Sequence, residues 1–179
     1  ANSGQPFNFT MLTVDTHCED GYVCDLCQDN HPGNQYANVM SCASRQVVDF
    51  VNWLKEQPFY ENTTIVIVGD HLTMDSDFCK DVPEEYTRGV YNAIINAPIV
   101  PVNQKNRQAT TMDMFPTTIA ALGAQIEGER LGLGTNLFSA EPTLAEKVGL
   151  DVLNGEVRKR SVFYEQLAGD EKVDDSVLD

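Results

Sequence analysis

The sequence predicts an α/β protein with a mostly parallel sheet flanked by helices. The run Thr64–Val68 contains only β-branched residues, which is typical of a strand buried on both faces. Residues 36–57 repeat apolar side chains every three or four positions, as on one face of a helix that stops at Pro58. The segment Phe7–Val14 is rich in strand-forming residues. Strand, helix and strand in this order predict a right-handed parallel crossover.

The later part of the chain predicts shorter elements. An acidic loop over residues 72–87 leads to another strand at Val90–Ile95. A helix is predicted over residues 110–122, because a threonine can cap its start and Gly123 follows its end. Residues 131–138 are punctuated by glycines and predict a loop or a short strand.

The last segment differs from the rest in composition. Residues 141–179 predict one or two helices followed by an acidic tail, whose last residues, 173–179, are expected to fray. We therefore expect residues 1–140 to be the main domain portion and residues 141–179 to be a C-terminal helical extension.

Length and charge limit the possible functions. A chain of 179 residues suffices for one domain with a core. Its net charge of −15 opposes binding to nucleic acid or to anionic lipid headgroups. No stretch approaches the roughly 18 apolar residues of a membrane-spanning helix, and residues 1–10 do not have the pattern of a signal peptide. We expect this chain itself to be soluble.

Gly69-Asp70-His71 directly follows the predicted strand Thr64–Val68. Open α/β sheets bind ligands at this end of their strands, and an oxygen and a nitrogen ligand suit Mn²⁺, Zn²⁺ or Mg²⁺. His17 also follows a predicted strand and is expected at the same edge of the sheet. Taken without context, an Asp-His pair is more often a capping aspartate beside a loop histidine.

Five cysteines allow three interpretations. In an exported protein they predict disulfides, with at least one bond among Cys24, Cys27, Cys42 and Cys79. The alternatives are a zinc site at Cys24, Cys27 and Cys42 completed by Cys18 or Cys79, or free thiols. We favour disulfides.

Four motifs carry a family resemblance: Thr13–His17, Phe59–Thr64, Ile65–His71 and Arg107–Thr117. In order and spacing they resemble the extracellular catalytic domain of lipoteichoic acid synthases. These enzymes are phosphoglycerol transferases of the sulfatase/alkaline phosphatase superfamily. The resemblance covers residues 7–138, which is most of the chain.

The resemblance implies an alkaline phosphatase-like fold whose N-terminal half is incomplete here. It implies that Asp70 and His71 bind a divalent metal, with Mn²⁺ preferred and Mg²⁺, Zn²⁺ or Ca²⁺ as alternatives. His17 would bind the phosphate of a glycerophosphate lipid or polymer. The family's nucleophile is a Thr near the start of the domain, in a segment that would lie before Ala1, so we expect this chain alone to be inactive.

The resemblance also implies a location and leaves alternatives. The parent protein would be anchored in a bacterial membrane, with this part on the extracellular face. A sulfatase or phosphodiesterase of the same superfamily is the alternative enzyme, and a non-catalytic extracellular module is the alternative of another class.

Several charged residues have competing interpretations. Asp75 and Asp77 could tune the metal or bind a second ion, but a solvated acidic loop is the preferred interpretation. For Arg107 and Asp113 we prefer a structural role, as a buried pair or a cap that fixes the predicted helix.

Overall fold

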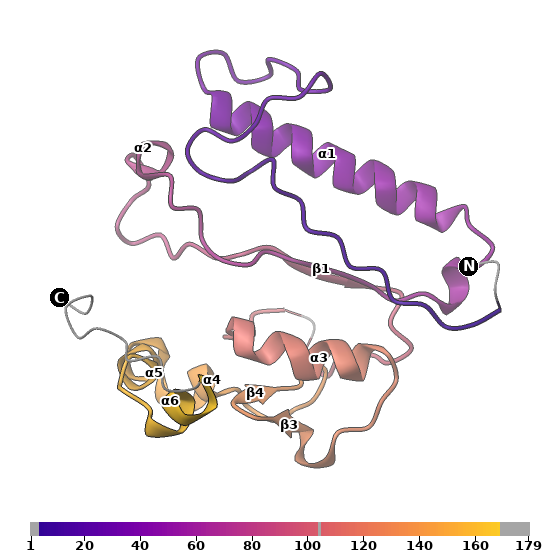
Figure 1. The fold of residues 1–179 in the computed structure, drawn as a ribbon, viewed down its shortest axis with the longest axis vertical. Helices are drawn as coiled ribbons and strands as arrows, with labels where there is room; N and C mark the ends of the chain where they lie inside the picture. Colours follow the sequence, from indigo (N-terminus) through magenta and orange to yellow (C-terminus); the bar gives the residue numbers. More distant parts are fainter. Residues whose placement is uncertain (1–3, 104, 169–179) are drawn as a thin grey trace. The chain divides into compact units, whose positions relative to one another are not determined.

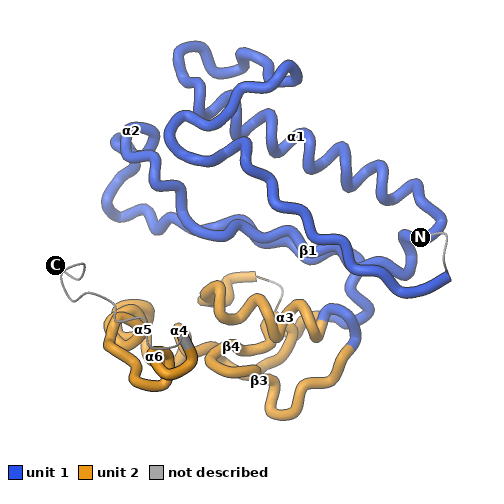
Figure 2. Tube along the Cα trace, viewed as in Figure 1, with its two compact units in different colours: residues 1–100, 121–123 blue, residues 101–120, 124–179 orange. Residues whose placement is uncertain are grey.

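The computed structural model describes residues 4–103 and 105–168 of the chain. The predicted acidic tail lies outside the described residues from position 169 onward. Among the described residues, no helix combines the length and the apolar character needed to cross a membrane. The chain groups into two compact units, coloured separately in Figure 2. Unit 1 comprises residues 1–100 and 121–123, and unit 2 comprises residues 101–120 and 124–179.

The longest helix of unit 1 is α1, Gln35–Lys55 (Figure 1). The Asn34 side chain caps its start by accepting a hydrogen bond from the Ala37 N–H. The predicted helix at residues 36–57 is therefore confirmed to within two residues at each end. Its buried side chains lie on one face and are Tyr36, Val39, Cys42 and Val51.

The sheet of unit 1 has two strands, β1 (Ile65–Val68) and β2 (Asn92–Ile95). They pair in antiparallel register, with Ile65 opposite Ile95. Both strands were predicted, but the described residues contain no parallel pair, so the predicted parallel sheet is not confirmed. The prediction that β1 is buried on both faces was wrong, because its first three residues are only half-buried and Val68 is 46% exposed.

The segment Phe7–Val14 forms no strand in the structure. Two of its aromatic rings make contacts instead: Phe7 meets Phe59 edge-on at 5.6 Å, and Phe9 lies 6.5 Å from Phe50 of α1. The strand prediction was wrong here because β propensity becomes a strand only where a second backbone accepts the ladder of hydrogen bonds.

Two short helical turns complete unit 1. The 3₁₀ turn η1 (Tyr60–Asn62) leads into β1, and helix α2 (Ser76–Cys79) interrupts the loop between β1 and β2. The loop before α1 lies against that helix at Gly21, whose φ is +64°. A Cβ there would lie 2.6 Å from the Asp15 carbonyl oxygen and 2.8 Å from Val39 Cγ1. The close approach therefore requires glycine.

The first half of unit 2 contains the predicted late helix. It begins as a 3₁₀ turn, η2 (Thr111–Asp113), and continues as α3 (Met114–Ala121), whose last residue is grouped with unit 1. Thr110 and Asp113 form a reciprocal capping box at its start. The helix prediction is confirmed because its signals are local caps.

The rest of unit 2 consists of short elements. The turn η3 (Glu127–Glu129) precedes an antiparallel pair, β3 (Arg130–Leu131) and β4 (Gly134–Thr135). Three short helices follow where one or two were predicted: α4 (Leu144–Val148), α5 (Leu150–Val157) and α6 (Val162–Ala168). The predicted boundary at residue 140 concerns the extent of a family domain and stays a prediction.

Candidate functional site

Asp70 and His71 directly follow β1. The Gly69 N–H still donates to the Tyr91 carbonyl (2.8 Å), so the ladder with β2 continues to the residue before Asp70. The two side chains then approach each other, with His71 Nε2 3.4 Å from Asp70 Oδ2. The histidine side chain is 59% exposed and the aspartate side chain 74%. The structure thus brings the two predicted metal ligands together at a solvent-accessible position.

The hydrogen bonds of His71 determine which ring nitrogen is free. Nδ1 lies 2.8 Å from the Leu72 carbonyl oxygen, so Nδ1 carries the proton and donates it. The lone pair of Nε2 then faces Asp70 Oδ2, so that both atoms can act as ligands of one ion. Two ligand atoms each about 2.1 Å from one tetrahedral ion are about 3.4 Å apart. The donor types and their separation fit a divalent cation.

His17 repeats the arrangement of His71 on another loop. Its Nδ1 lies 2.7 Å from the Cys18 carbonyl oxygen, which again leaves Nε2 as the free nitrogen of an exposed ring. The free nitrogen can accept a hydrogen bond, or donate one to an anionic oxygen when the ring is protonated. The assignment of His17 to substrate binding stays a prediction.

The Tyr36 hydroxyl joins the loops that carry the two histidines. It donates to the Thr16 carbonyl oxygen (2.8 Å), next to His17, and lies 2.8 Å from Thr73 Oγ1, two residues after His71. Because the phenol proton goes to the carbonyl, the Thr73 hydroxyl donates to Tyr36. Tyr36 is only 3% exposed and lies in the first turn of α1. This buried bond pair, which the sequence reasoning missed, fixes both loops to one helix end.

Asp75 forms a second cross-link between the same loops. Its Oδ2 accepts a hydrogen bond from the Asp20 N–H (3.0 Å), and its Oδ1 accepts one from the Phe78 N–H (2.9 Å) at the start of α2. Both bonds lower the pKa of the Asp75 carboxyl, and the bond from the Asp20 N–H has the larger effect. Asp75 is 4% exposed, so its assignment to a solvated loop was wrong: backbone N–H groups replace water around it. Asp77 is exposed, as that interpretation expected.

Arg107 and Asp113 have structural roles in unit 2, as preferred. The Arg107 guanidinium forms a bidentate pair with Glu146, at 2.8 and 2.9 Å. The Asp113 carboxylate accepts hydrogen bonds from the N–H groups of Thr110 and Thr135, each at 2.8 Å. Arg107 also donates to three carbonyl oxygens, those of Leu137, Ser139 and Glu141. These polar groups are occupied by partners inside the unit.

The cysteines differ from the favoured expectation. All five are unbonded in the structure. The Cys24 sulfur lies 3.7 Å from that of Cys27 and 3.9 Å from that of Cys42, whereas a disulfide bond measures about 2.05 Å. Cys24, Cys27 and Cys42 form the one set of three or more Cys, His, Asp or Glu side chains in the described part of the chain whose ligand atoms lie within 4.8 Å of one another.

Comparison with known proteins identifies relatives of the chain. The sequence pattern of the sulfatase family matches residues 1–124, a range that contains His17, Asp70 and His71. Phosphoglycerol transferase I of Citrobacter koseri is 29% identical over 147 residues, and that of Escherichia coli strain SMS-3-5 is 30% identical over 153 residues. Each match covers 79% of this chain and 19% of the relative, so the chain spans about a fifth of those proteins. No solved structure matches the chain significantly.

Proposed function

The chain belongs to the sulfatase family, and on this premise we propose that it supplies the metal-binding and substrate-binding part of a phosphoglycerol transferase. The observation that carries the proposal is the approach of Asp70 Oδ2 and His71 Nε2 to 3.4 Å at the end of β1. The names of the similar proteins favour phosphoglycerol as the transferred group.

In this proposal Asp70 and His71 hold a divalent metal ion. Mn²⁺ is the preferred ion, with Mg²⁺, Zn²⁺ and Ca²⁺ as alternatives, because the ligands are one carboxylate oxygen and one imidazole nitrogen. The bound ion would lower the pKa of the attacking hydroxyl and stabilise charge on the phosphoryl oxygens. The hydrogen bond from His71 Nδ1 to the Leu72 carbonyl holds the ring so that Nε2 stays available.

His17 contributes to the substrate side of the same site. Its ring is held by the Cys18 carbonyl through Nδ1, and the exposed Nε2 can contact a phosphate oxygen or the leaving oxygen. Tyr36 is a positioning residue, because it fixes the backbone beside His17 and the loop after His71 through one hydroxyl.

The nucleophile in this proposal is a Thr that the present chain does not supply. It would carry the phosphoglycerol covalently before transfer to a hydroxyl acceptor of a glycerophosphate lipid or polymer. The reaction would take place on the extracellular face of a bacterial membrane. By itself the chain of 179 residues should release no glycerophosphate above the buffer level.

The test compares three variants of the intact protein that contains this chain: Asp70→Ala, His71→Ala and His17→Ala. Metal content and glycerophosphate release are measured on each. The first two should lose bound metal and at least about 100-fold in rate, because metal ions contribute several kcal/mol to such reactions. His17→Ala should keep its metal and lose rate.

The matched control is His31→Ala, since the His31 ring bonds to Ser41 of α1 and the proposal gives this histidine no role. Full activity in the Asp70 variant, or loss of metal in the His17 variant, would contradict these roles. Release of sulfate from sulfate esters without glycerophosphate transfer would favour a sulfatase. Absence of both activities in a metal-loaded wild-type protein would favour a non-catalytic module.

A further inference from the structure

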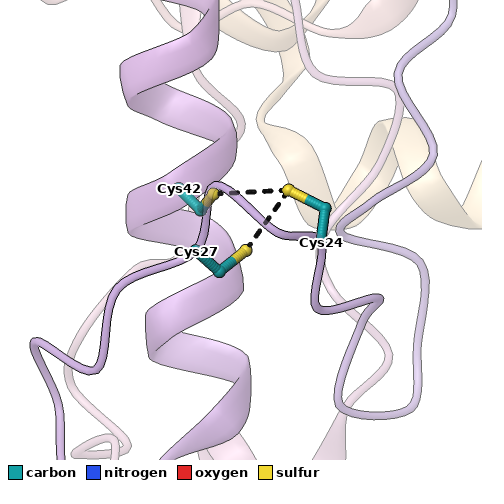
Figure 3. A group of neighbouring side chains, drawn as sticks. All are labelled: Cys24, Cys27 and Cys42. Carbon is teal, nitrogen blue, oxygen red and sulfur yellow. Dashed lines mark hydrogen bonds between the residues drawn. The ribbon is translucent and has the colours of Figure 1, made fainter.

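Three cysteine sulfurs converge beside α1 in unit 1 (Figure 3). Cys24 and Cys27 come from the loop before the helix, and the buried Cys42 comes from the helix itself. The Cys24 sulfur is 3.7 Å from Cys27 and 3.9 Å from Cys42. Thiolates bound at about 2.3 Å to one tetrahedral zinc ion are about 3.8 Å apart. The observed separations match this spacing and exceed a disulfide bond by nearly a factor of two, as that bond is about 2.05 Å long.

The Cys24-x-x-Cys27 turn directs backbone donors at a sulfur. The Cys27 N–H donates to the Cys24 carbonyl (3.0 Å), which closes the turn. The pKa of the Cys24 thiol is lowered, chiefly by a hydrogen bond from the Leu26 backbone N–H. The pKa of Cys27 is raised to about 11, chiefly by the hydrogen bond that it shares with Cys42. The turn therefore holds the Cys24 and Cys27 sulfurs next to the sulfur of Cys42.

Two side chains of α1 surround the sulfurs with further donors. The Gln46 amide donates to Cys42 Sγ (3.5 Å) and to Cys24 Sγ (3.7 Å). The Arg45 guanidinium lies 3.7 Å from Cys42 Sγ and donates to the Leu26 carbonyl (2.7 Å). Donors and a positive charge favour thiolates over thiols.

We propose that Cys24, Cys27 and Cys42 bind one zinc ion through three thiolates and thereby fasten the loop before α1 to that helix. Each thiol loses its proton to solvent on binding, and the resulting charge of −1 on the site is offset by Arg45. Among the described residues the set comprises these three cysteines, so the proposal assigns three protein ligands. The site is separate from Asp70 and His71 and does not depend on the proposed function.

The experiment measures zinc in the intact protein, purified under reducing conditions and equilibrated with Zn²⁺, together with its Cys27→Ser, Cys24→Ser and Cys42→Ser variants. Each variant should lose one equivalent of zinc. Cys18→Ser and Cys79→Ser are the matched controls and should keep it. Asp70→Ala should also keep the thiolate-bound ion, which separates this site from the proposed catalytic metal. Because Cys42 is buried and its variant can fail to fold, the decisive variant is Cys27→Ser on the half-buried loop.

A second measurement identifies the ligands. After Co²⁺ replaces Zn²⁺, the wild-type protein should show thiolate-to-cobalt charge-transfer absorption, and the Cys27→Ser variant should lose a large part of it. Unchanged zinc and absorption in that variant would overturn the proposal. A disulfide among the three cysteines, found by peptide mapping of protein that was never reduced and cannot be loaded with zinc, would also overturn it.

Discussion

The two polar motifs Asp70-His71 of unit 1 and Arg107–Asp113 of unit 2 differ in how completely their side chains are paired. In unit 2, Asp113 is 2% exposed and accepts backbone hydrogen bonds, and Arg107 is bound to Glu146 and three carbonyl oxygens. In unit 1, Asp70 and His71 are mostly exposed, and the free ring nitrogen faces an acceptor rather than a donor. Both motifs were recognised from the same family resemblance. A buried motif whose polar groups all have hydrogen-bond partners therefore has a structural role. An exposed motif in which one polar group has no donor partner can bind a ligand.

The largest expected effect that tests this contrast is on stability. Arg107→Ala should lower the free energy of unfolding of unit 2 by about 3 kcal/mol, because Glu146 and three carbonyl oxygens lose the donors of a guanidinium that is only 11% exposed. Asp70→Ala should change it by less than about 0.5 kcal/mol, because Asp70 is exposed. Urea denaturation of the two variants measures both. Equal losses would remove the distinction between the two kinds of polar residue.

Acid should weaken unit 2 through Glu146. The pKa of Glu146 is lowered from 4.5 to about 2, and hydrogen bonds from the Arg107 side chain are the largest cause. A carboxyl group whose pKa is lower in the folded state than in the unfolded state stabilises the fold at pH values above its unfolded-state pKa. This stabilisation is complete above about pH 5 and is lost as the pH falls through 4.5 towards 2. Solvent screens this partly exposed pair, so the full loss should be about 2 kcal/mol. Unfolding measured across this pH range should show a flatter profile in Glu146→Gln than in the wild-type protein; identical profiles would assign the acid sensitivity to other groups.

Tyr36→Phe should have an intermediate effect that reaches the candidate site. Removing the hydroxyl leaves the Thr16 carbonyl and the Thr73 hydroxyl without their buried partner, which costs about 1–3 kcal/mol. If the loops position the proposed catalytic groups, glycerophosphate release should also fall, by roughly 10-fold or more. Tyr91→Phe is the matched control, because Tyr91 is 71% exposed. A stability loss without any loss of rate would leave Tyr36 with a purely structural role.

The smallest effect is expected for the exposed ion pair of unit 2. Lys147 Nζ lies 2.6 Å from Glu141 Oε1, but the two side chains are 40% and 38% exposed. Lys147→Ala should therefore cost less than about 1 kcal/mol, and salt should reduce the effect further. Thermal unfolding at low and high salt provides the measurement. A cost as large as that of Arg107→Ala would mean that burial does not decide the strength of pairs in this unit.

The parts of the fold that were predictable from sequence rest on local signals. Helix α1 has an apolar repeat, an Asn cap and a proline beyond its end, and the start of α3 has its capping box within four residues. Pairing was not predictable in the same way: β1 was recognised, but its antiparallel partner β2 follows after a long loop. Phe7–Val14 had strand composition without a partner strand among the described residues.

The site residues were predictable where they directly follow a predicted secondary-structure element. Asp70 and His71 could be chosen because they directly follow β1. Tyr36 was missed because an aromatic residue in the first turn of a helix reads as packing, and its two oxygen partners are distant in sequence. Asp75 had a local signal that was not used, since an aspartate three residues before Phe78 fits an N-cap.

The cross-links made by Tyr36 and Asp75 also determine how the two loops can move. The Asp20 and Phe78 amides are both bonded to one carboxylate, and the Asp75 N–H is bonded to Thr73, which in turn is bonded to Tyr36. Neither loop can swing away from α1 without breaking a bond that holds the other. In amide hydrogen exchange, these backbone protons should therefore exchange in one shared opening event rather than residue by residue. The two loops that carry the histidines would then detach from α1 together, in a single step.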